Sequence, residues 1–479
     1  MSLNTSRASA WSFGARLVAQ ISGMLLLLVG ARVLSAAELG FFALASAVAM
    51  LISRLAEAGW TQYVMAWEGS RLPAATVFWT GLGVASAGGA AGVLGGLGYV
   101  WLGGDGPFGW LLASLSALIP FGAVTALQYG ILTRDGRIGA IAGITITSDL
   151  IALAAGVATL VDGGGVLALL VNRAVMTAVS LAASVAVARW VPPFALERAA
   201  ALAAVSFVRR LTATQLIEFA KTYGAEFVLA LVLGAAEVGI YRLASRVVGA
   251  ISELFSEPLR MLSWATLSRA RAKSDAGWKP GADGERIVFS TALLALPSFI
   301  GLSLVAGRTV QVLMGEDWAA AAPVIAVLAI ARLFALPSIV AEPMLVLVGQ
   351  VRLLPLITVL SSAVSVLLLL GLAPYGPVGA ATSQLLSALL TLPVVIWAQV
   401  RYAEVRWASI LHELKAAAAA VAVLAAAVAA VSWKASEWHL PSWLSLSACI
   451  VVGGTIYAGL IFLSYRAYCR TVLLAFLRP

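Results

Sequence analysis

The chain has 479 residues, of which 61% are hydrophobic and only 11% are charged, with a mean hydropathy of +0.98 and a formal net charge of +9. Soluble domains carry about 25% charged residues, and this chain has too few polar residues to cover a water-exposed surface. The composition therefore excludes soluble enzymes, disordered chains and disulfide scaffolds, and it indicates a polytopic membrane protein built mostly of helices.

Long apolar stretches, separated by charged residues, Gly or Pro, predict fourteen membrane-spanning helices. In chain order the predicted spans are 11–33, 40–65, 76–102, 108–132, 139–161, 166–190, 210–235, 238–264, 287–306, 320–347, 353–373, 377–400, 415–433 and 443–465.

Lysine and arginine test this topology because they concentrate in cytoplasmic loops. If the N-terminus is cytoplasmic, only Arg32, Arg308 and Lys434 of the 31 basic residues fall on the opposite side. The alternation predicts that both termini are cytoplasmic. It also explains the positive net charge, so we expect no nucleic-acid partner.

A long internal repeat relates the two halves of the chain. Residues 33–53 (VLSAAELGFFALASAVAMLIS) match residues 232–252 (VLGAAEVGIYRLASRVVGAIS) at 12 of 21 positions, at a constant offset of 199. The copies enter the second and the eighth predicted spans. Because six spans separate them, both copies have the same membrane orientation, which is the parallel kind of repeat.

The repeat predicts two facing six-helix bundles, followed by two extra helices. We expect an N-terminal bundle over 1–190, a cytoplasmic link over 191–209, a C-terminal bundle over 210–400 and two accessory helices within 401–479. The link should form a short amphipathic helix on the cytoplasmic surface. The predicted fold class is therefore all-α, a polytopic membrane protein of about 14 transmembrane helices.

The repeated pattern V-L-(S/G)-A-A-E-(L/V)-G-(F/I)-(F/Y)-x-L-A-S resembles the polysaccharide transporter family of the multidrug, oligosaccharidyl-lipid and polysaccharide exporter superfamily. The resemblance covers the first twelve helices. It implies a flippase that moves a lipid-linked oligosaccharide, carried on polyprenyl pyrophosphate, across the bacterial inner membrane for lipopolysaccharide or exopolysaccharide synthesis. It also implies membrane lipids, a polysaccharide polymerase and glycosyltransferases as partners, and a monomeric transporter.

Charged residues within spans are the functional candidates, because a charge at the bilayer centre costs about 3 kcal/mol and survives only where it faces protein or water. On the eighth span the residues that share one polar face are Arg242, Arg246, Gly249, Glu253, Ser256 and Arg260. A polar face on an apolar helix predicts one wall of a water-filled chamber. Salt bridges within one bundle are the alternative.

Shifting this face by 199 residues gives a second polar face on the second span, which carries Arg54 and Glu57. Arg54 and Glu253 occupy equivalent positions, so they could pair across the chamber. They could equally pair locally, Arg54 with Glu57 and Glu253 with Arg246.

A cationic chamber suits a pyrophosphate-linked sugar, since arginine binds phosphate through a planar fork. The predicted substrate-binding residues are Arg54, Arg242, Arg246, Glu253, Arg332, Arg16 and Gln20. The residues predicted for coupling are Glu57, Glu218, Lys221, Glu226 and Glu257.

Two other classes of function compete with this interpretation. The first is an ion-coupled multidrug exporter of the same superfamily, which would need a chamber rich in carboxylates, and the acidic residues keep that alternative open. A flippase for a lipid-linked peptidoglycan precursor is a closely related alternative. A membrane enzyme would need a sizeable extracytoplasmic segment for its chemistry. The sequence shows no nucleophile–base pair, metal-ligand cluster or nucleotide-binding loop, so we expect no enzyme activity, metal or cofactor.

Overall fold

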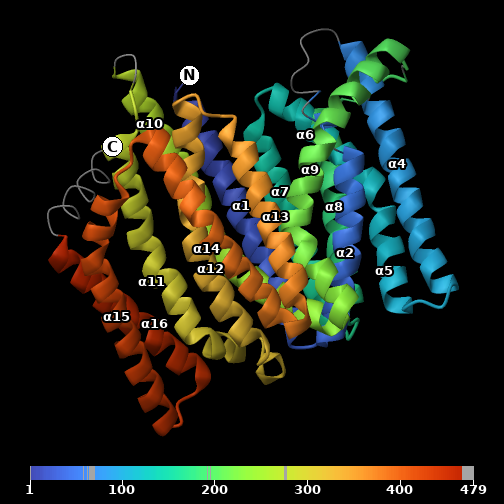
Figure 1. Cartoon of the computed structure of the whole chain (residues 1–479). Coiled ribbons are helices and arrows are strands. Elements are labelled where there is room, and N and C mark those ends of the chain that lie inside the picture. The colour runs from blue at the N-terminus through green and yellow to red at the C-terminus, as the bar shows by residue number, and fades with distance from the viewer. Residues whose placement is uncertain are drawn as a thin grey trace. The chain divides into compact units, whose positions relative to one another are not determined.

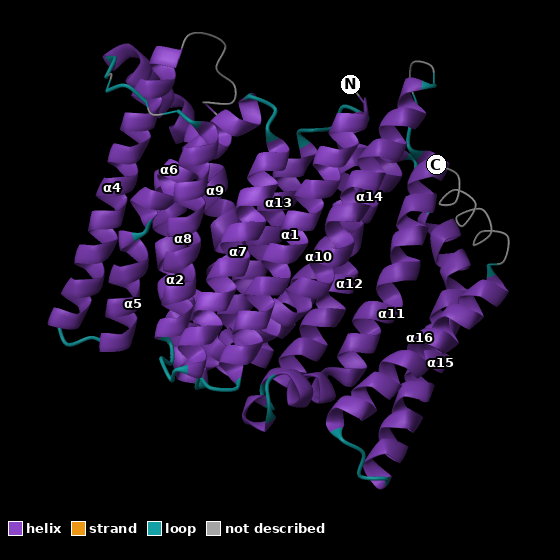
Figure 2. Ribbon diagram, turned by 180° about the vertical axis from the view of Figure 1, so that it is seen from behind, coloured by secondary structure: helices purple, strands orange, loops and turns teal. Residues whose placement is uncertain are grey.

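The structure is a computed structural model that describes residues 2–57, 59–61, 63, 71–190, 192–194, 196–274 and 278–465. Helices account for nearly all of this described part, which contains no strand (Figures 1 and 2). The all-α fold class predicted from the sequence is confirmed. A membrane favours helices, because each helix forms its own backbone hydrogen bonds.

The chain divides into two compact units, Met1–Arg242 and Leu243–Pro479. The helices of the first unit are α1 (Ser2–Ala31), α2 (Ala36–Glu57), α4 (Arg71–Trp101), α5 (Gly106–Ala117), α6 (Ile119–Arg134), α7 (Ile138–Val161), α8 (Leu167–Ala188), α9 (Arg198–Leu233) and the start of α10 (Ala235–Ala272). The second unit contains the rest of α10, then α11 (Gly281–Leu313), η1 (Glu316–Trp318), α12 (Ala321–Leu347), α13 (Leu353–Leu372), η2 (Ala373–Tyr375), α14 (Gly376–Ala403), α15 (Trp407–Glu437) and α16 (Ser442–Ser464).

Each of the fourteen predicted spans coincides with a described helix, or with the consecutive pair α5 and α6. Eleven stretches of the described chain are long and apolar enough to cross a membrane, and one of them, Leu353–Ala403, contains both α13 and α14. The helices missing from that set are α9 and α10, whose charged residues lower their hydropathy. In α9 only the short segment Tyr223–Leu233 is apolar by this measure.

The link between the predicted bundles differs from expectation at one point. The separate short helix predicted there is instead the beginning of α9, which starts at Arg198 and runs without a break to Leu233. The sequence explains this continuity, because residues 198–223 are rich in Ala and contain neither Pro nor Gly. Helices of that composition propagate readily. The predicted bundle boundaries themselves stay predictions.

Three pairs of equivalent helices pack in the same way in the two units. In the first unit α4 contacts α5 and α6, α6 contacts α8, and α7 contacts α8. In the second unit the corresponding pairs are α11 with α12, α12 with α14, and α13 with α14. The repeat detected in one short sequence segment therefore extends to the packing of whole helices.

The last two helices, α15 and α16, pack on α11 (Figures 1 and 2). A buried cluster joins Val305 of α11 to Leu424, Val428, Cys449 and Tyr457 of the hairpin.

One hydrogen bond within this contact has a specific cause. Pro297 lies inside α11 and has no N–H to donate to the carbonyl of Leu293. The hydroxyl of Tyr457 donates to that carbonyl at 2.8 Å. Tyr457 of the accessory hairpin therefore supplies the hydrogen-bond donor that Pro297 cannot give to the Leu293 carbonyl.

Candidate functional site

An ion pair between a buried carboxylate and a half-buried arginine joins α9 to α10 in the first unit. The Nη1 atom of Arg242 donates to Oε1 of Glu226 at 2.7 Å. Glu226 is only 2% exposed, and the guanidinium carbon of Arg242 lies 5.4 Å from the centre of the Tyr223 ring. A buried charge is costly unless a partner offsets it. Each residue thus supplies the charge that the other needs.

This pair changes the interpretation of two predicted site residues. The sequence assigns Arg242 to substrate phosphate and Glu226 to coupling, as separate roles. The structure brings them together, so a phosphate could bind Arg242 only in competition with Glu226. The second carboxylate oxygen of Glu226 is buried and has no hydrogen-bond partner among the described residues, which leaves an acceptor inside the site.

On α2 the predicted residues have different surroundings. The Arg54 side chain is exposed. Glu57 accepts a hydrogen bond from the Ser53 hydroxyl at 2.6 Å, and no ion pair joins it to Arg54 in the described part of the chain. The local pairing considered for Arg54 from the sequence is therefore absent in this structure.

The remaining predicted residues are spread over several helices. In the second unit Glu253 and Arg332 are exposed on α10 and α12, and Arg246 is half-buried on α10. In the first unit Arg16 is exposed and Gln20 is half-buried on α1. The side chains outside the described set are those of Glu218, Lys221 and Glu257.

Two glycines bring the starts of α2 and α10 into backbone contact within the first unit. A Cβ atom added at Gly40 would overlap the carbonyl oxygen of Ala235, and one added at Gly239 would overlap the carbonyl oxygen of Ala36. Both glycines and both alanines are equivalent at the offset of 199. Only glycine allows this approach, and the contact is reciprocal.

The two copies of the repeat begin their helices differently. Ser35 and Glu38 form a capping box, in which the Glu38 carboxylate accepts from the Ser35 backbone N–H at 2.8 Å and the Ser35 hydroxyl accepts from the Glu38 N–H at 3.3 Å. In the second copy the equivalent of Ser35 is Gly234, whose φ of 96° lets α9 turn directly into α10. Both devices fix the helix start beside the glycine contact.

Comparison with known proteins assigns the family. The sequence profile of a family described as "Polysaccharide biosynthesis protein" matches residues 29–323, which is more than half of the chain. The chain belongs to this family. The resemblance noted from the repeated sequence pattern is thereby confirmed.

One named relative and three solved structures are informative. The succinoglycan biosynthesis transport protein ExoT of Rhizobium meliloti (strain 1021) is 26% identical over 323 residues, which are 67% of this chain and 64% of ExoT. The match thus spans less than two thirds of that relative. The lipid II flippase MurJ, in an inward closed conformation, has a TM-score of 0.76 at 12% identity and covers 96% of this chain and 99% of its own.

Two further structures share the fold at lower similarity. The MATE transporter VcmN of Vibrio cholerae has a TM-score of 0.52 at 15% identity, covering 83% of this chain and 97% of its own. A MOP superfamily transporter from Pyrococcus furiosus has a TM-score of 0.53 at 11% identity, covering 82% and 95%. This member of the polysaccharide biosynthesis family therefore has the multi-pass transporter fold.

Proposed function

We propose that the protein flips a lipid-linked oligosaccharide, carried on polyprenyl pyrophosphate, from the inner to the outer leaflet of the bacterial inner membrane during surface polysaccharide synthesis. Family membership is the observation that carries this proposal. The named relative is a succinoglycan transport protein and one solved neighbour is a lipid flippase. The first name supports transport during polysaccharide synthesis, and the second supports a cargo attached to a lipid.

Two exposed arginines suit an anionic cargo. The buried carboxylate of Glu226 is neutralised by Arg242, so it is not a free ligand for a cationic drug. Arg54 and Arg332 are exposed and form no ion pair with a described residue. Arginine suits a pyrophosphate because its planar fork matches phosphate geometry.

The reciprocal glycine contact supports alternating access as the mechanism. The arginine distribution assigns the starts of α2 and α10 to the extracytoplasmic side, so contact at Gly40 and Gly239 closes that end in the first unit. Opening to the outside requires the two helix starts to separate. Cargo that enters from the cytoplasm would then leave outward.

The family resemblance and the arginine distribution support further parts of this proposal. The protein acts as a monomer with both termini in the cytoplasm. Glycosyltransferases supply its cargo, and a polysaccharide polymerase consumes the flipped product. The surrounding membrane lipids are the solvent for the polyprenyl chain.

A gene deletion tests the proposed function. We expect the deletion strain to lose its surface polysaccharide and to accumulate the lipid-linked repeat unit in spheroplasts, where added glycosidase cannot reach it. A plasmid copy of the gene should restore both. A control assay of ethidium efflux should be unchanged. Normal surface polysaccharide together with reduced ethidium efflux would instead support a drug exporter and refute the flippase.

A further inference from the structure

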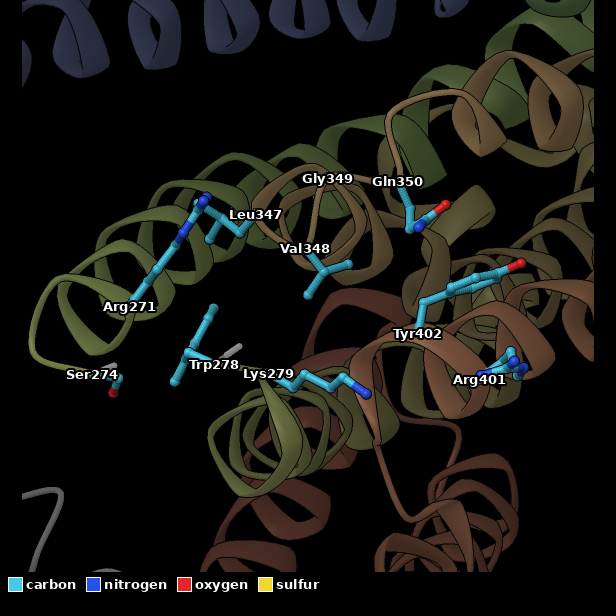
Figure 3. Close-up of a pocket in the computed structure, with 10 residues that line it drawn as sticks. All are labelled: Arg271, Ser274, Trp278, Lys279, Leu347, Val348, Gly349, Gln350, Arg401 and Tyr402. Carbon is cyan, nitrogen blue, oxygen red and sulfur yellow. The ribbon is translucent and has the colours of Figure 1, made fainter. Parts of the chain in front are cut away.

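Charged residues outside the site described above differ in their depth along the spans. Figure 3 shows a cavity in the second unit at the ends of α10, α12 and α14, with Arg271 and Arg401 at its opposite ends. Charged side chains at the ends of spans reach water, so these two arginines require no ligand. In the first unit, by contrast, Asp149 lies in the middle of α7 and Arg173 lies nearly two turns inside α8. Charges within a span must face protein or water.

Asp149 lies on the face of α7 that is directed toward its helix neighbours. Gly156 is buried two turns further along this face. A Cβ atom added at Gly156 would lie 2.9 Å from Leu26 of α1 and 3.1 Å from Asn172 of α8. Residues seven positions apart share one face of a helix. The Asp149 carboxylate therefore belongs to the interior of the first unit and not to its lipid-facing surface.

α8 carries a polar face whose exposure rises along the helix. The residues of this face follow one another at steps of 4, 3 and 4 positions, and they are Arg173, Thr177, Ser180 and Ser184. Ser184 is fully buried near the end of α8 that the arginine distribution assigns to the cytoplasm. Thr177 and Ser180 are half-buried, and Arg173 is exposed. Because a polar face avoids hydrocarbon, its exposed part lines a water-accessible space within the span.

Asp149 connects this face to a third helix. It interacts electrostatically with Arg173 of α8 and with Tyr129 of α6, and a hydrogen bond joins the hydroxyl groups of Tyr129 and Thr145. Each of these four side chains remains at least half-exposed or partly exposed. The carboxylate and the guanidinium thus offset each other's charge while both can still reach a ligand.

The groups on these three helices form a mixed set of donors and acceptors. The hydroxyl of Thr177 donates to the Arg173 carbonyl at 2.9 Å, and that of Ser180 donates to the Thr177 carbonyl at 3.1 Å. Their oxygen atoms therefore remain as acceptors, as does the Asp149 carboxylate. The Arg173 guanidinium offers only donors, and the Tyr129 hydroxyl offers one of each kind.

A sugar fits this set better than an ion does. Each sugar hydroxyl both donates and accepts, so two neighbouring hydroxyls can donate to a carboxylate and accept from a guanidinium. A cationic drug would need a carboxylate without a counter-charge, and a pyrophosphate would need an arginine without one. Asp149 and Arg173 supply neither, because each offsets the charge of the other.

We propose that Asp149 and Arg173 bind neighbouring hydroxyl groups in the sugar portion of the cargo, with Tyr129 and Thr177 as further hydrogen-bonding partners. This assignment rests on the proposed function and names the residues of the first unit that recognise the sugar. The pyrophosphate of the cargo is left to other arginines. Sugar and pyrophosphate therefore contribute to affinity through different side chains.

Native mass spectrometry of the purified full chain tests the assignment with two ligands that differ only in the sugar. One is the lipid-linked repeat unit extracted from a polymerase-deficient strain, and the other is polyprenyl pyrophosphate of the same chain length. The ratio of the second dissociation constant to the first measures the contribution of the sugar. We expect Asp149→Asn and Arg173→Gln each to lower this ratio by about tenfold or more, because hydrogen bonds to a charged group are lost. The affinity for polyprenyl pyrophosphate should change by no more than about twofold.

Matched controls remove the same chemical groups elsewhere in the first unit. Asp162→Asn and Arg189→Gln change exposed residues that directly follow α7 and α8, and the ratio should stay within about twofold of the wild type. If the charged variants are not monodisperse, Thr177→Val should lower the ratio by about threefold, as expected for one neutral hydrogen bond. Its control is Thr147→Val, which removes an exposed hydroxyl from the opposite face of α7 to Asp149.

Three results would overturn the sugar assignment. The first is a wild type for which the sugar adds no affinity, and the second is an equal ratio in the wild type and the site variants. The third is an unchanged ratio in variants that fail to restore surface polysaccharide to the deletion strain, which would assign the pair to coupling. Failure of the proposed function itself would be seen separately, as a deletion strain that keeps its surface polysaccharide.

Discussion

Gly40 and Gly239 stand 199 residues apart in the sequence and meet at a single helix crossing, each against the backbone that precedes the other. The Cβ position of Gly239 lies 3.1 Å from the Gly40 nitrogen. Such reciprocity is the signature of a two-fold axis. The two copies of the internal repeat therefore contact each other at this crossing, within the first unit.

Substitution of either glycine should oppose closure of this crossing. Gly40→Ala or Gly239→Ala places a methyl group against a carbonyl, and overpacking of this kind costs about 1–3 kcal/mol. The readout is disulfide crosslinking between cysteines introduced at Phe42 and Tyr241, in an otherwise cysteine-free background. We expect efficient crosslinking with both glycines present, together with blocked export, and lower yield with either alanine.

The matched control is Gly83→Ala on α4, where an added Cβ meets no atom within 4 Å. This change should leave the crosslinking yield as it is. If the alanines at the crossing also leave it unchanged, the close contact is not a determinant of closure. If no crosslink forms in any state despite confirmed thiol labelling, the facing arrangement of the two helix starts is refuted.

Removal of either partner of the ion pair between Glu226 and Arg242 should destabilise the first unit. Arg242→Gln leaves the buried Glu226 carboxylate without its counter-charge and should cost about 3 kcal/mol. Glu226→Gln should cost less, because the Arg242 side chain is 30% exposed. The check is the thermal unfolding of the purified protein in detergent. The swapped variant, Glu226→Arg with Arg242→Glu, should recover part of the loss. Additive losses in the swapped variant would show that the two side chains do not depend on each other.

The hydroxyl of Tyr457 should matter only while Pro297 is present. Tyr457→Phe leaves the Leu293 carbonyl without a donor and should cost about 1 kcal/mol. In a Pro297→Ala background the new N–H can bond that carbonyl within α11, so the same change should cost less. A double-mutant cycle on thermal stability measures the difference. Equal costs in the two backgrounds would rule out the proline as the reason for this contact.

The equivalent positions of Arg54 and Glu253 lead to a prediction on transport. No ion pair joins Arg54 to Glu57 among the described residues, and the pairing of Glu253 with Arg54 or with Arg246 stays a pair of competing hypotheses to test. Arg54→Glu and Glu253→Arg should each abolish restoration of surface polysaccharide in a deletion strain, and the double exchange should restore some. A stably expressed double exchange without any recovery would contradict the pairing.

Much of the fold could be predicted because the membrane restricts the options. Apolar stretches bounded by charged residues, Gly or Pro predicted all fourteen spans. Mean hydropathy over a long window misses α9 and α10, but the second copy of the repeat, which begins at residue 232, independently indicates a span start where α9 passes into α10.

The candidate site could be predicted only in part. A periodic pattern identifies the polar face of α10 but not the helix that packs against it, so the Glu226 partner of Arg242 was not expected. The glycine contact was visible as two equivalent glycines, yet in a chain with 44 glycines that identity carried no distinct signal. Both relationships depend on where helices cross in space, and the spacing of residues along the sequence does not specify those crossings.

The reciprocal crossing also has an evolutionary consequence. An interface in which residue i contacts j while j contacts i is the isologous kind found in symmetric homodimers. A half-length ancestor would need only one glycine to build both sides of such a contact. Once two copies are fused into one gene, each glycine is inherited separately, and the exchange of Ser35 for Gly234 at the adjacent helix start shows that the copies have already diverged there. After duplication the contact depends on two codons, and a mutation of one glycine leaves the other glycine unchanged.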